Sequence, residues 1–136
     1  MSIIDKELEV IEEFAMFEDW MEKYEYIIEL GKDLPLINEE EKIEENLIKG
    51  CQSRVWVSSS VSNGVVRFSA DSDAIITKGI IALLIRVLSE EKAEDIVRSE
   101  LNFIKEIGLQ EHLSPTRANG LVGMVKRIKE LALANC

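Results

Sequence analysis

The chain has 136 residues and a formal net charge of −10, and 46% of its residues are hydrophobic. This length fits one domain, and the hydrophobic content indicates a globular fold rather than disorder. The charge is uneven: residues 1–45 carry 16 acidic and 4 basic side chains, a net of −12, whereas residues 46–136 carry 10 and 12, a net of +2. An acidic surface repels phosphate backbones, which argues against nucleic-acid binding. Solvated helix faces explain the acidic third most simply, and steering of a basic partner is the alternative.

The chain shows no segment of the kind that targets or spans a membrane. Residues 1–13 alternate charged and apolar side chains and lack the hydrophobic core of a signal peptide. The most apolar run, Gly79–Ile85, is far too short to cross a bilayer. We therefore expect a single cytoplasmic domain over residues 1–136. Cys51 and Cys136 are expected to be free thiols, because the cytoplasm keeps thiols reduced.

Two amphipathic helices are predicted in the acidic first third. The first runs from Asp5 to Met16. Its apolar side chains recur at helical spacing, at Ile4, Leu8, Ile11, Phe14 and Ala15. The second begins at Asp19, with Glu22 three residues later as in a capping box, and ends near Gly31. Its expected buried stripe consists of Trp20, Tyr24, Ile27 and Ile28.

A β-hairpin is predicted after an acidic connector at residues 38–45. Arg54–Val61 and Val65–Ala70 are rich in β-branched residues and are separated by Ser62-Asn63-Gly64. An Asn-Gly pair between two such runs is the strongest short-range signal for a hairpin. Asn46–Ile48 is a candidate for a short third strand.

The rest of the chain predicts helices. Asp71-Ser72-Asp73 offers several N-cap candidates for a helix that runs to about Leu88. This helix is apolar nearly all round, which is typical of the buried centre of a domain. Two shorter helices are expected near Ala93–Arg98 and Leu101–Ile107, the second ended by Gly108.

The last helix is predicted to begin at Ser114-Pro115, a hydroxyl cap followed by proline in the first turn. Within it, Gly120-Leu121-Val122-Gly123 is interpreted as a place of close packing rather than a phosphate-binding loop. The expected buried stripe consists of Leu121, Val125, Ile128, Leu131 and Ala132. Together the elements predict an α+β fold, with a small antiparallel sheet of about three strands and helices covering one face.

The most informative segment is Gly50-Cys51-Gln52-Ser53-Arg54-Val55-Trp56, which holds the one internal cysteine. A thiol can act as a nucleophile, a redox centre or a metal ligand, and Gly50 allows Cys51 to lie at a loop tip. The alternative is a small buried hydrophobic side chain. With one histidine, His112, and no CxxC pair, a metal site within one subunit is not expected. A Cys–His hydrolase using His112 is a further alternative, although a lone histidine is more often a cap or surface residue.

A cysteine without a resident base suits attack on another sulfur, because this exchange needs neither a proton shuttle nor an oxyanion hole. Cys51 could then carry a sulfane sulfur as a persulfide, on a flexible loop over an apolar pocket. Burial would raise the pKa of its thiol, and a nearby cation would lower it. The candidate cations are Arg117, Arg54, Lys49 and Lys78, each with a solvated surface role as the alternative.

Three blocks carry a resemblance to a known family. They are the segment around Cys51, Asp71-Ser72-Asp73-Ala74 through Lys78-Gly79, and Leu113-Ser114-Pro115-Thr116-Arg117 with Asn119-Gly120-Leu121. In these blocks the chain resembles SufE, the cysteine desulfuration protein of iron–sulfur cluster assembly. The CsdE sulfur acceptor, a close paralogue, shares the same motifs. The resemblance covers nearly the whole chain in order.

The resemblance implies an α+β fold like that of the iron–sulfur scaffold proteins. It also implies that Cys51 accepts sulfur from the persulfide of a SufS-like or CsdA-like cysteine desulfurase, stimulates that enzyme and supplies a SufBCD-like scaffold complex. The PLP cofactor belongs to the desulfurase, and no cofactor or metal is expected on this chain. A homodimer is left open, as is a cluster scaffold that uses Cys51 across a dimer. The supporting motif positions implied around Cys51 are Gly50, Gln52, Ser53, Asp71, Asp73, Lys78 and Arg117.

Physical arguments add roles for a few of these positions. Asp71 or Asp73 is expected to cap the following helix, with docking of a basic desulfurase surface as a second role. Arg117 lies in the first turn of its helix, an unfavourable place for a cation, which indicates a compensating anion. That anion is either Asp71 or Asp73, or a sulfur-bearing ligand. Trp56 is expected to pack in the core against the hydrophobic helix.

Overall fold

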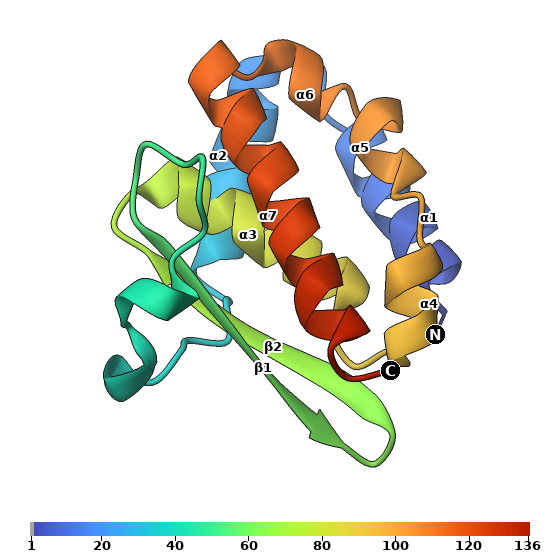
Figure 1. Ribbon diagram of the computed structural model, residues 1–136. Coiled ribbons are helices and arrows are strands. Elements are labelled where there is room, and N and C mark those ends of the chain that lie inside the picture. Colours follow the sequence, from blue (N-terminus) through green and yellow to red (C-terminus); the bar gives the residue numbers. More distant parts are fainter. Residues whose placement is uncertain (1) are drawn as a thin grey trace.

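The computed structural model describes residues 2–136 and confirms the α+β fold. Over this range the chain forms seven α-helices, two short 3-10 helices and one two-stranded antiparallel sheet (Figure 1). In chain order the elements are α1 (Ile3–Ala15), α2 (Trp20–Gly31), η1 (Glu39–Glu41), η2 (Glu44–Asn46), β1 (Val55–Ser62), β2 (Val65–Ser72), α3 (Ile75–Leu88), α4 (Ala93–Arg98), α5 (Asn102–Glu106), α6 (Leu109–His112) and α7 (Pro115–Leu133). No helix within residues 2–136 has the length and apolar character needed to cross a bilayer.

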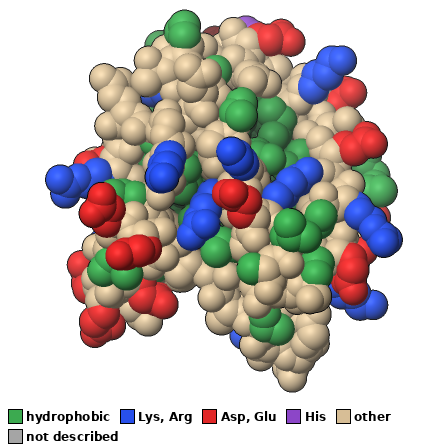
Figure 2. Space-filling model, in the orientation of Figure 1, with side chains coloured by type: hydrophobic (Ala, Val, Ile, Leu, Met, Phe, Trp, Pro, Cys, Tyr) green, Lys and Arg blue, Asp and Glu red, His purple; other side chains and the backbone are tan. Residues whose placement is uncertain are grey.

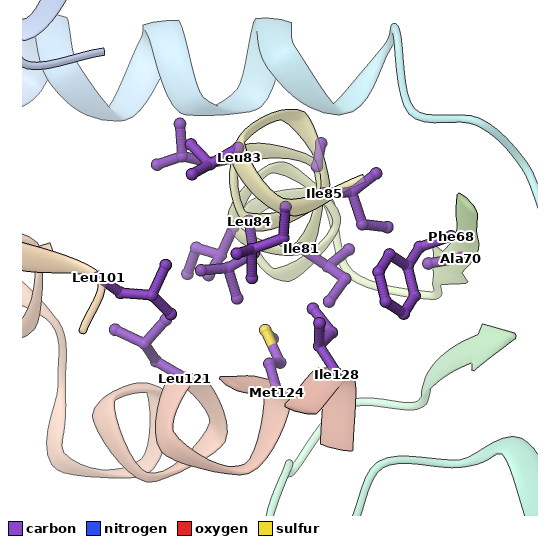
Figure 3. Close-up of a cluster of buried hydrophobic side chains, with 14 of the residues drawn as sticks. Phe68, Ala70, Ile81, Leu83, Leu84, Ile85, Leu101, Leu121, Met124 and Ile128 are labelled. Carbon is purple, nitrogen blue, oxygen red and sulfur yellow. The ribbon is translucent and has the colours of Figure 1, made fainter. Parts of the chain in front are cut away.

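Helix α3 lies at the centre of the molecule, as its apolar sequence predicts. It contacts α1, α2, α7 and β2. Figure 3 shows Met124 and Ile128 of α7 pointing toward Ile81 and Leu84 of α3, with Phe68 of β2 beside them. The core therefore joins the hairpin, the central helix and the last helix, and this junction positions the functional site.

The predicted limits of α1 are close to those observed. Of the predicted buried stripe, Phe14 is buried and Ile11 is half-buried, whereas Ile4, Leu8 and Ala15 are exposed. Ile4 is 68% exposed and Leu8 is 52% exposed. The face is rotated by one residue because Glu7 is buried and accepts a hydrogen bond from the Phe103 amide at 3.0 Å. A buried carboxylate with a backbone donor is acceptable in a core, which hydrophobic spacing alone does not reveal. The buried residues of α1 are Ile3, Glu7, Val10 and Phe14.

Helix α2 begins at the predicted cap, since the Asp19 carboxylate accepts from the Glu22 amide at 3.0 Å. Gly31 is its last residue rather than a residue beyond its end. This glycine packs against α3: a Cβ on it would lie 3.1 Å from the Gly79 nitrogen. Reciprocally, a Cβ on Gly79 would overlap the carbonyl oxygen of Ile27, so the two helix backbones nearly touch. Of the predicted stripe of α2, Ile27 is buried, while Trp20, Tyr24 and Ile28 are half-buried.

The hairpin has the predicted turn. Asn63 and Gly64 have φ values of 53° and 79°, as a tight two-residue turn between antiparallel strands requires. Strand β1 pairs antiparallel with β2 from Val55 opposite Ser72 to Ser62 opposite Val65. The predicted third strand is absent from the described chain: Leu47 forms one isolated bridge to Trp56, and the segment before it forms η1 and η2.

The predicted caps of α3 are also wrong. Strand β2 continues through Ser72, and the helix is preceded by Ala74, which makes no side-chain cap. The Asp73 carboxylate instead accepts a hydrogen bond from the Arg54 amide at 3.0 Å. The polar run therefore ties β2 to the loop that precedes β1 rather than to the helix.

Four helices follow α3, where two short ones and a long one were expected. Gly108, with φ of 71°, separates α5 from α6, and the sequence analysis missed α6. Helix α7 begins as predicted, with the Ser114 hydroxyl accepting from the Arg117 amide at 3.3 Å. Val125 and Leu131 are half-buried rather than buried. The buried positions of α7 are Gly120, Leu121, Met124, Ile128 and Ala132.

Candidate functional site

Cys51 lies in the loop that joins η2 to β1, hereafter the Cys51 loop (residues 47–54). Gly50 precedes it with φ of 91°, a backbone conformation that favours glycine. The Cys51 side chain is half-buried against α7, where its Sγ donates a weak hydrogen bond to the Gly120 carbonyl oxygen at 3.7 Å. The thiol is therefore covered in this structure, and one sulfur contact of this kind provides little to hold it there.

Two glycines on one face of α7 let the Cys51 loop approach the helix. A Cβ on Gly120 would lie 3.2 Å from the Cys51 Sγ, and a Cβ on Gly123 would lie 2.6 Å from the Lys49 carbonyl oxygen. The second distance is too short for any real side chain. The interpretation of these glycines as a place of close packing is confirmed, and what they pack against is the loop that carries the thiol.

A cavity of about 90 Å³ lies beside the thiol. Its walls come from the Cys51 loop, α3 and the first turns of α7. A single ordered water needs only ~10–15 Å³ on this kind of measure, so the cavity has room for more than the thiol. We call it the Cys51 cavity; its lining residues are Cys51, Gln52, Ser53, Thr77, Ile80, Thr116, Arg117, Gly120 and Met124.

Burial raises the pKa of the Cys51 thiol, so the covered side chain is held in its neutral form. Among the candidate cations, Arg117 lines the cavity. Its side chain is exposed and forms no ion pair with any carboxylate of residues 2–136. Lys49 and Arg54 lie on the loop, on either side of Cys51, but neither lines the cavity. The site thus combines a neutral, half-buried thiol with an unpaired guanidinium at its edge.

Comparison with known proteins assigns the family. The family model for SufE, described as an Fe-S metabolism associated domain, matches residues 8–132. The chain belongs to the SufE family. This assignment places the protein in iron–sulfur metabolism and confirms the resemblance carried by the three motif blocks.

Relatives of similar length share this SufE assignment. An uncharacterized SufE-like protein of Rhizobium meliloti is 39% identical over 129 residues, which cover 91% of this chain and 92% of that protein. An uncharacterized SufE-like protein of Rhizobium etli is 40% identical over 129 residues, covering 91% and 87%. A hypothetical protein from Thermus thermophilus, known from its solution structure, matches with a TM-score of 0.79 and 22% identity, covering 95% and 94%. The last likeness shows a shared fold.

The SufE motif blocks meet only in part at the Cys51 cavity. Gln52, Ser53 and Arg117 line it together with Cys51, as the resemblance implied. The second block contributes Thr77 to the cavity wall, whereas its charged members face elsewhere. Residues that the sequence analysis missed are Thr77, Ile80, Thr116 and Met124. A polar residue inside the apolar run of α3 was the one signal that could have pointed to Thr77.

Asp71 does not line the Cys51 cavity and pairs with two lysines elsewhere in the SufE fold. Its carboxylate pairs with Lys42 at 2.7 Å and with Lys78 at 3.4 Å. Burial raises the pKa of this carboxyl, but the hydrogen bonds from Lys42 and the Ser72 amide and the charges of both lysines outweigh it, so the pKa is lowered overall. Asp71 therefore anchors the η1 segment to the hairpin, and it pairs with neither Arg117 nor the thiol.

Trp56 is not a core residue, contrary to expectation. It is half-buried, and the Lys42 ammonium lies over its ring at 5.5 Å from the centroid. Its neighbours Val55 and Val57 are fully buried, because successive side chains of a strand point to opposite faces. Trp56 thus covers the outer face of the hairpin beside η1 and η2.

His112 is engaged away from the thiol. Its ring stacks on Trp20, with centroids 4.1 Å apart, and its Nδ1 lies 2.9 Å from the Gly108 carbonyl oxygen. It does not line the Cys51 cavity. The Cys–His pair considered from the sequence is therefore not assembled in this structure.

Charge is distributed over the surface as the sequence predicts. In Figure 2, acidic side chains gather at the lower left, over the η1–η2 segment, while lysines and arginines lie across the middle of the same face, where α7 runs. The Cys51 loop lies between these two regions, since it joins η2 to β1 and packs on α7.

Proposed function

We propose that Cys51 is the acceptor of sulfane sulfur from the persulfide of a PLP-dependent cysteine desulfurase. The protein thereby stimulates that enzyme and delivers the sulfur to an iron–sulfur cluster scaffold complex. The observation that carries this proposal is the placement of Cys51 at a loop tip, beside a cavity with room for an additional sulfur atom. Membership of a family associated with iron–sulfur metabolism supports the same chemistry.

The proposed transfer is a thiol–persulfide exchange. The Cys51 thiolate attacks the outer sulfur of the donor persulfide, so that an S–S bond forms at Cys51 while the S–S bond of the donor breaks. The donor cysteine leaves as a thiolate and takes up the proton that Cys51 has released. No external oxidant or reductant is needed, because one neutral sulfur atom moves from one cysteine to the other.

The covered thiol must change its environment before it can react. Burial keeps Cys51 protonated, whereas the attacking species is the thiolate. The Cys51 side chain therefore has to move out toward the donor. Its thiol makes one weak hydrogen bond, to Gly120, whereas the ends of the loop are attached through Lys49 against Gly123 and Arg54 bonded to Asp73. Arg117, which is exposed and unpaired within the described chain, is placed to stabilise the anion during transfer. Removal of sulfur frees the donor cysteine for its next turnover, which explains the stimulation.

The test is stimulation of a cognate desulfurase, measured as alanine released from cysteine with and without this protein. Cys51→Ser should abolish the stimulation, and Cys136→Ser should retain it. Arg117→Ala should lower it while leaving the unfolding midpoint unchanged, because Arg117 is exposed. Full stimulation by Cys51→Ser would refute the proposal.

A further inference from the structure

The wall of the Cys51 cavity includes a hydroxyl-bearing residue of the core that the proposed transfer has not used. The chain has two threonines, Thr77 and Thr116, and both line this cavity. Thr116 is exposed at the start of α7, whereas Thr77 on α3 is 7% exposed. The Thr77 hydroxyl makes no hydrogen bond to another residue of the described chain. The side-chain hydrogen bonds just before α3 involve Ser72 and Asp73 instead.

The part of the cavity wall that lies in the core beside Thr77 is apolar. Ile80, one helical turn further along α3, and Met124 of α7 are each 1% exposed. Gln52 and Ser53 are polar, but they belong to the Cys51 loop and move with it. Thr77 is fixed on the central helix of the core. The Thr77 hydroxyl has no partner among the described residues and is not one of the fully buried polar atoms, so its hydrogen-bond partner comes from the contents of the cavity.

We propose that Thr77 is a positioning residue that donates a hydrogen bond to the outer sulfur of the Cys51 persulfide when the loaded loop folds back onto α7. This inference rests on the proposed function of Cys51. A hydroxyl can donate one hydrogen bond, and the anionic outer sulfur is an acceptor that the resting thiol lacks. The resting thiol instead donates to Gly120, so the partner of Thr77 arrives with the added sulfur.

The hydrogen bond has a chemical consequence. It stabilises the persulfide anion inside the cavity, where reductants and other nucleophiles reach the outer sulfur only after the loop opens. Thr77 therefore lengthens the lifetime of the carried sulfur without contacting the desulfurase. Together with Arg117 at the cavity edge, it gives the anion one buried and one exposed polar neighbour.

The test measures this lifetime without the desulfurase, in a Cys136→Ser background that leaves Cys51 as the one thiol. Inorganic polysulfide loads Cys51: the thiolate takes one sulfur, and the polysulfide leaves one atom shorter. After desalting, cyanide removes the outer sulfur as thiocyanate and regenerates the Cys51 thiolate. The rate of thiocyanate formation is compared among the parent, Thr77→Val, Thr77→Ser and the matched control Thr116→Val.

We expect Thr77→Val to release thiocyanate about fivefold faster than the parent, the factor that corresponds to one ordinary hydrogen bond. Thr77→Ser should keep the slow rate because it keeps the hydroxyl, and Thr116→Val should also remain slow. If Thr77→Val does not fold, Thr77→Ser and Thr77→Ala supply the comparison, since they differ by the hydroxyl alone. Equal rates with and without the hydroxyl, or an equal acceleration by Thr116→Val, would overturn the inference.

The outcome is separable from that of the proposed function. If a cognate desulfurase fails to load Cys51 while the polysulfide-loaded variants still differ as expected, the proposed function falls and the role of Thr77 as a ligand of a Cys51-bound sulfur stands. If the desulfurase loads Cys51 and the Thr77 variants do not differ, the inference falls alone.

Discussion

Cys51 and Gly120 are in direct contact: the Cys51 Sγ lies 3.7 Å from the Gly120 carbonyl oxygen and 3.2 Å from the place that a Cβ on residue 120 would occupy. A Cβ at position 120 would therefore lie closer to the thiol than ordinary van der Waals contact allows, and the thiol would have to shift. Because Gly120 lies inside α7, whose position the core fixes, the Cys51 loop is the part that would have to move.

Gly120→Ala should displace the thiol from its cavity. Overpacking of this kind costs about 1–2 kcal/mol in the closed position, which raises the population of the open loop about 5–30-fold. Alkylation of Cys51 by iodoacetamide at fixed pH should accelerate accordingly in the Cys136→Ser background. Lys126→Ala, an exposed change on the same helix, is the control and should leave the rate unchanged. An unchanged rate in Gly120→Ala would show that the loop does not close against α7 in solution.

The alkylation rate of Cys51 should also report the effect of burial on its pKa. Since burial raises this pKa and the thiolate is the reactive form, the pH midpoint of the rate should lie above that of an ordinary thiol. In Gly120→Ala the midpoint should move back down, because the displaced thiol is solvated. A midpoint at or below the ordinary thiol value in the unmodified loop would contradict the covered position.

Gly79→Ala should destabilise the whole fold. The added Cβ would overlap the Ile27 carbonyl oxygen, so α2 and α3 would have to separate. We expect a loss of about 3 kcal/mol or more in the free energy of unfolding, measured by urea denaturation. Ile75→Ala, on the same helix but at an exposed position, should change stability by about 0.5 kcal/mol or less. Equal stability of the two variants would refute the close contact.

Asp71→Asn should weaken the attachment of the η1 segment to the hairpin. It removes the charge that pairs with Lys42 and Lys78, at a cost of about 1–2 kcal/mol at neutral pH. The pKa of Asp71 is lowered in the fold, so its contribution is present above the ordinary aspartate range and is lost as the pH falls through the lowered value.

The stabilities of the parent protein and Asp71→Asn should therefore converge as the pH falls below the lowered pKa of Asp71. Asp33→Asn, an exposed carboxylate, is the control for the general effect of charge. A difference that persists undiminished in acid would rule out the ionic origin of the contribution.

Local patterns in the sequence predicted the elements that depend on local physics. The Asn63-Gly64 turn, the Ser114 cap and the apolar α3 all formed as expected, because each is determined by neighbouring residues. Predictions failed where a residue distant in the sequence determines the burial or the hydrogen-bond partner of a side chain. The buried Glu7 carboxylate accepts a hydrogen bond from the Phe103 amide. The Asp73 carboxylate accepts one from the Arg54 amide and does not cap α3.

The candidate site was predictable to a similar degree. The motif blocks identified Cys51 and its neighbours on the loop, and the family resemblance implied that Arg117 lies near them. The cavity itself depends on how α3 and α7 cross, which no short pattern encodes. Thr77 and Met124 were therefore missed, although both lie in elements whose existence and type were predicted.

The most direct test of sulfur acceptance is mass mapping after incubation with a cognate desulfurase and cysteine. Transfer of one sulfur adds about 32 Da to the protein. The account predicts that this mass lies on the peptide containing Cys51, that it is lost on reduction, and that Cys136→Ser still acquires it. Sulfur found on Cys136 alone, or an unmodified Cys51 under conditions in which the desulfurase turns over, would contradict the account.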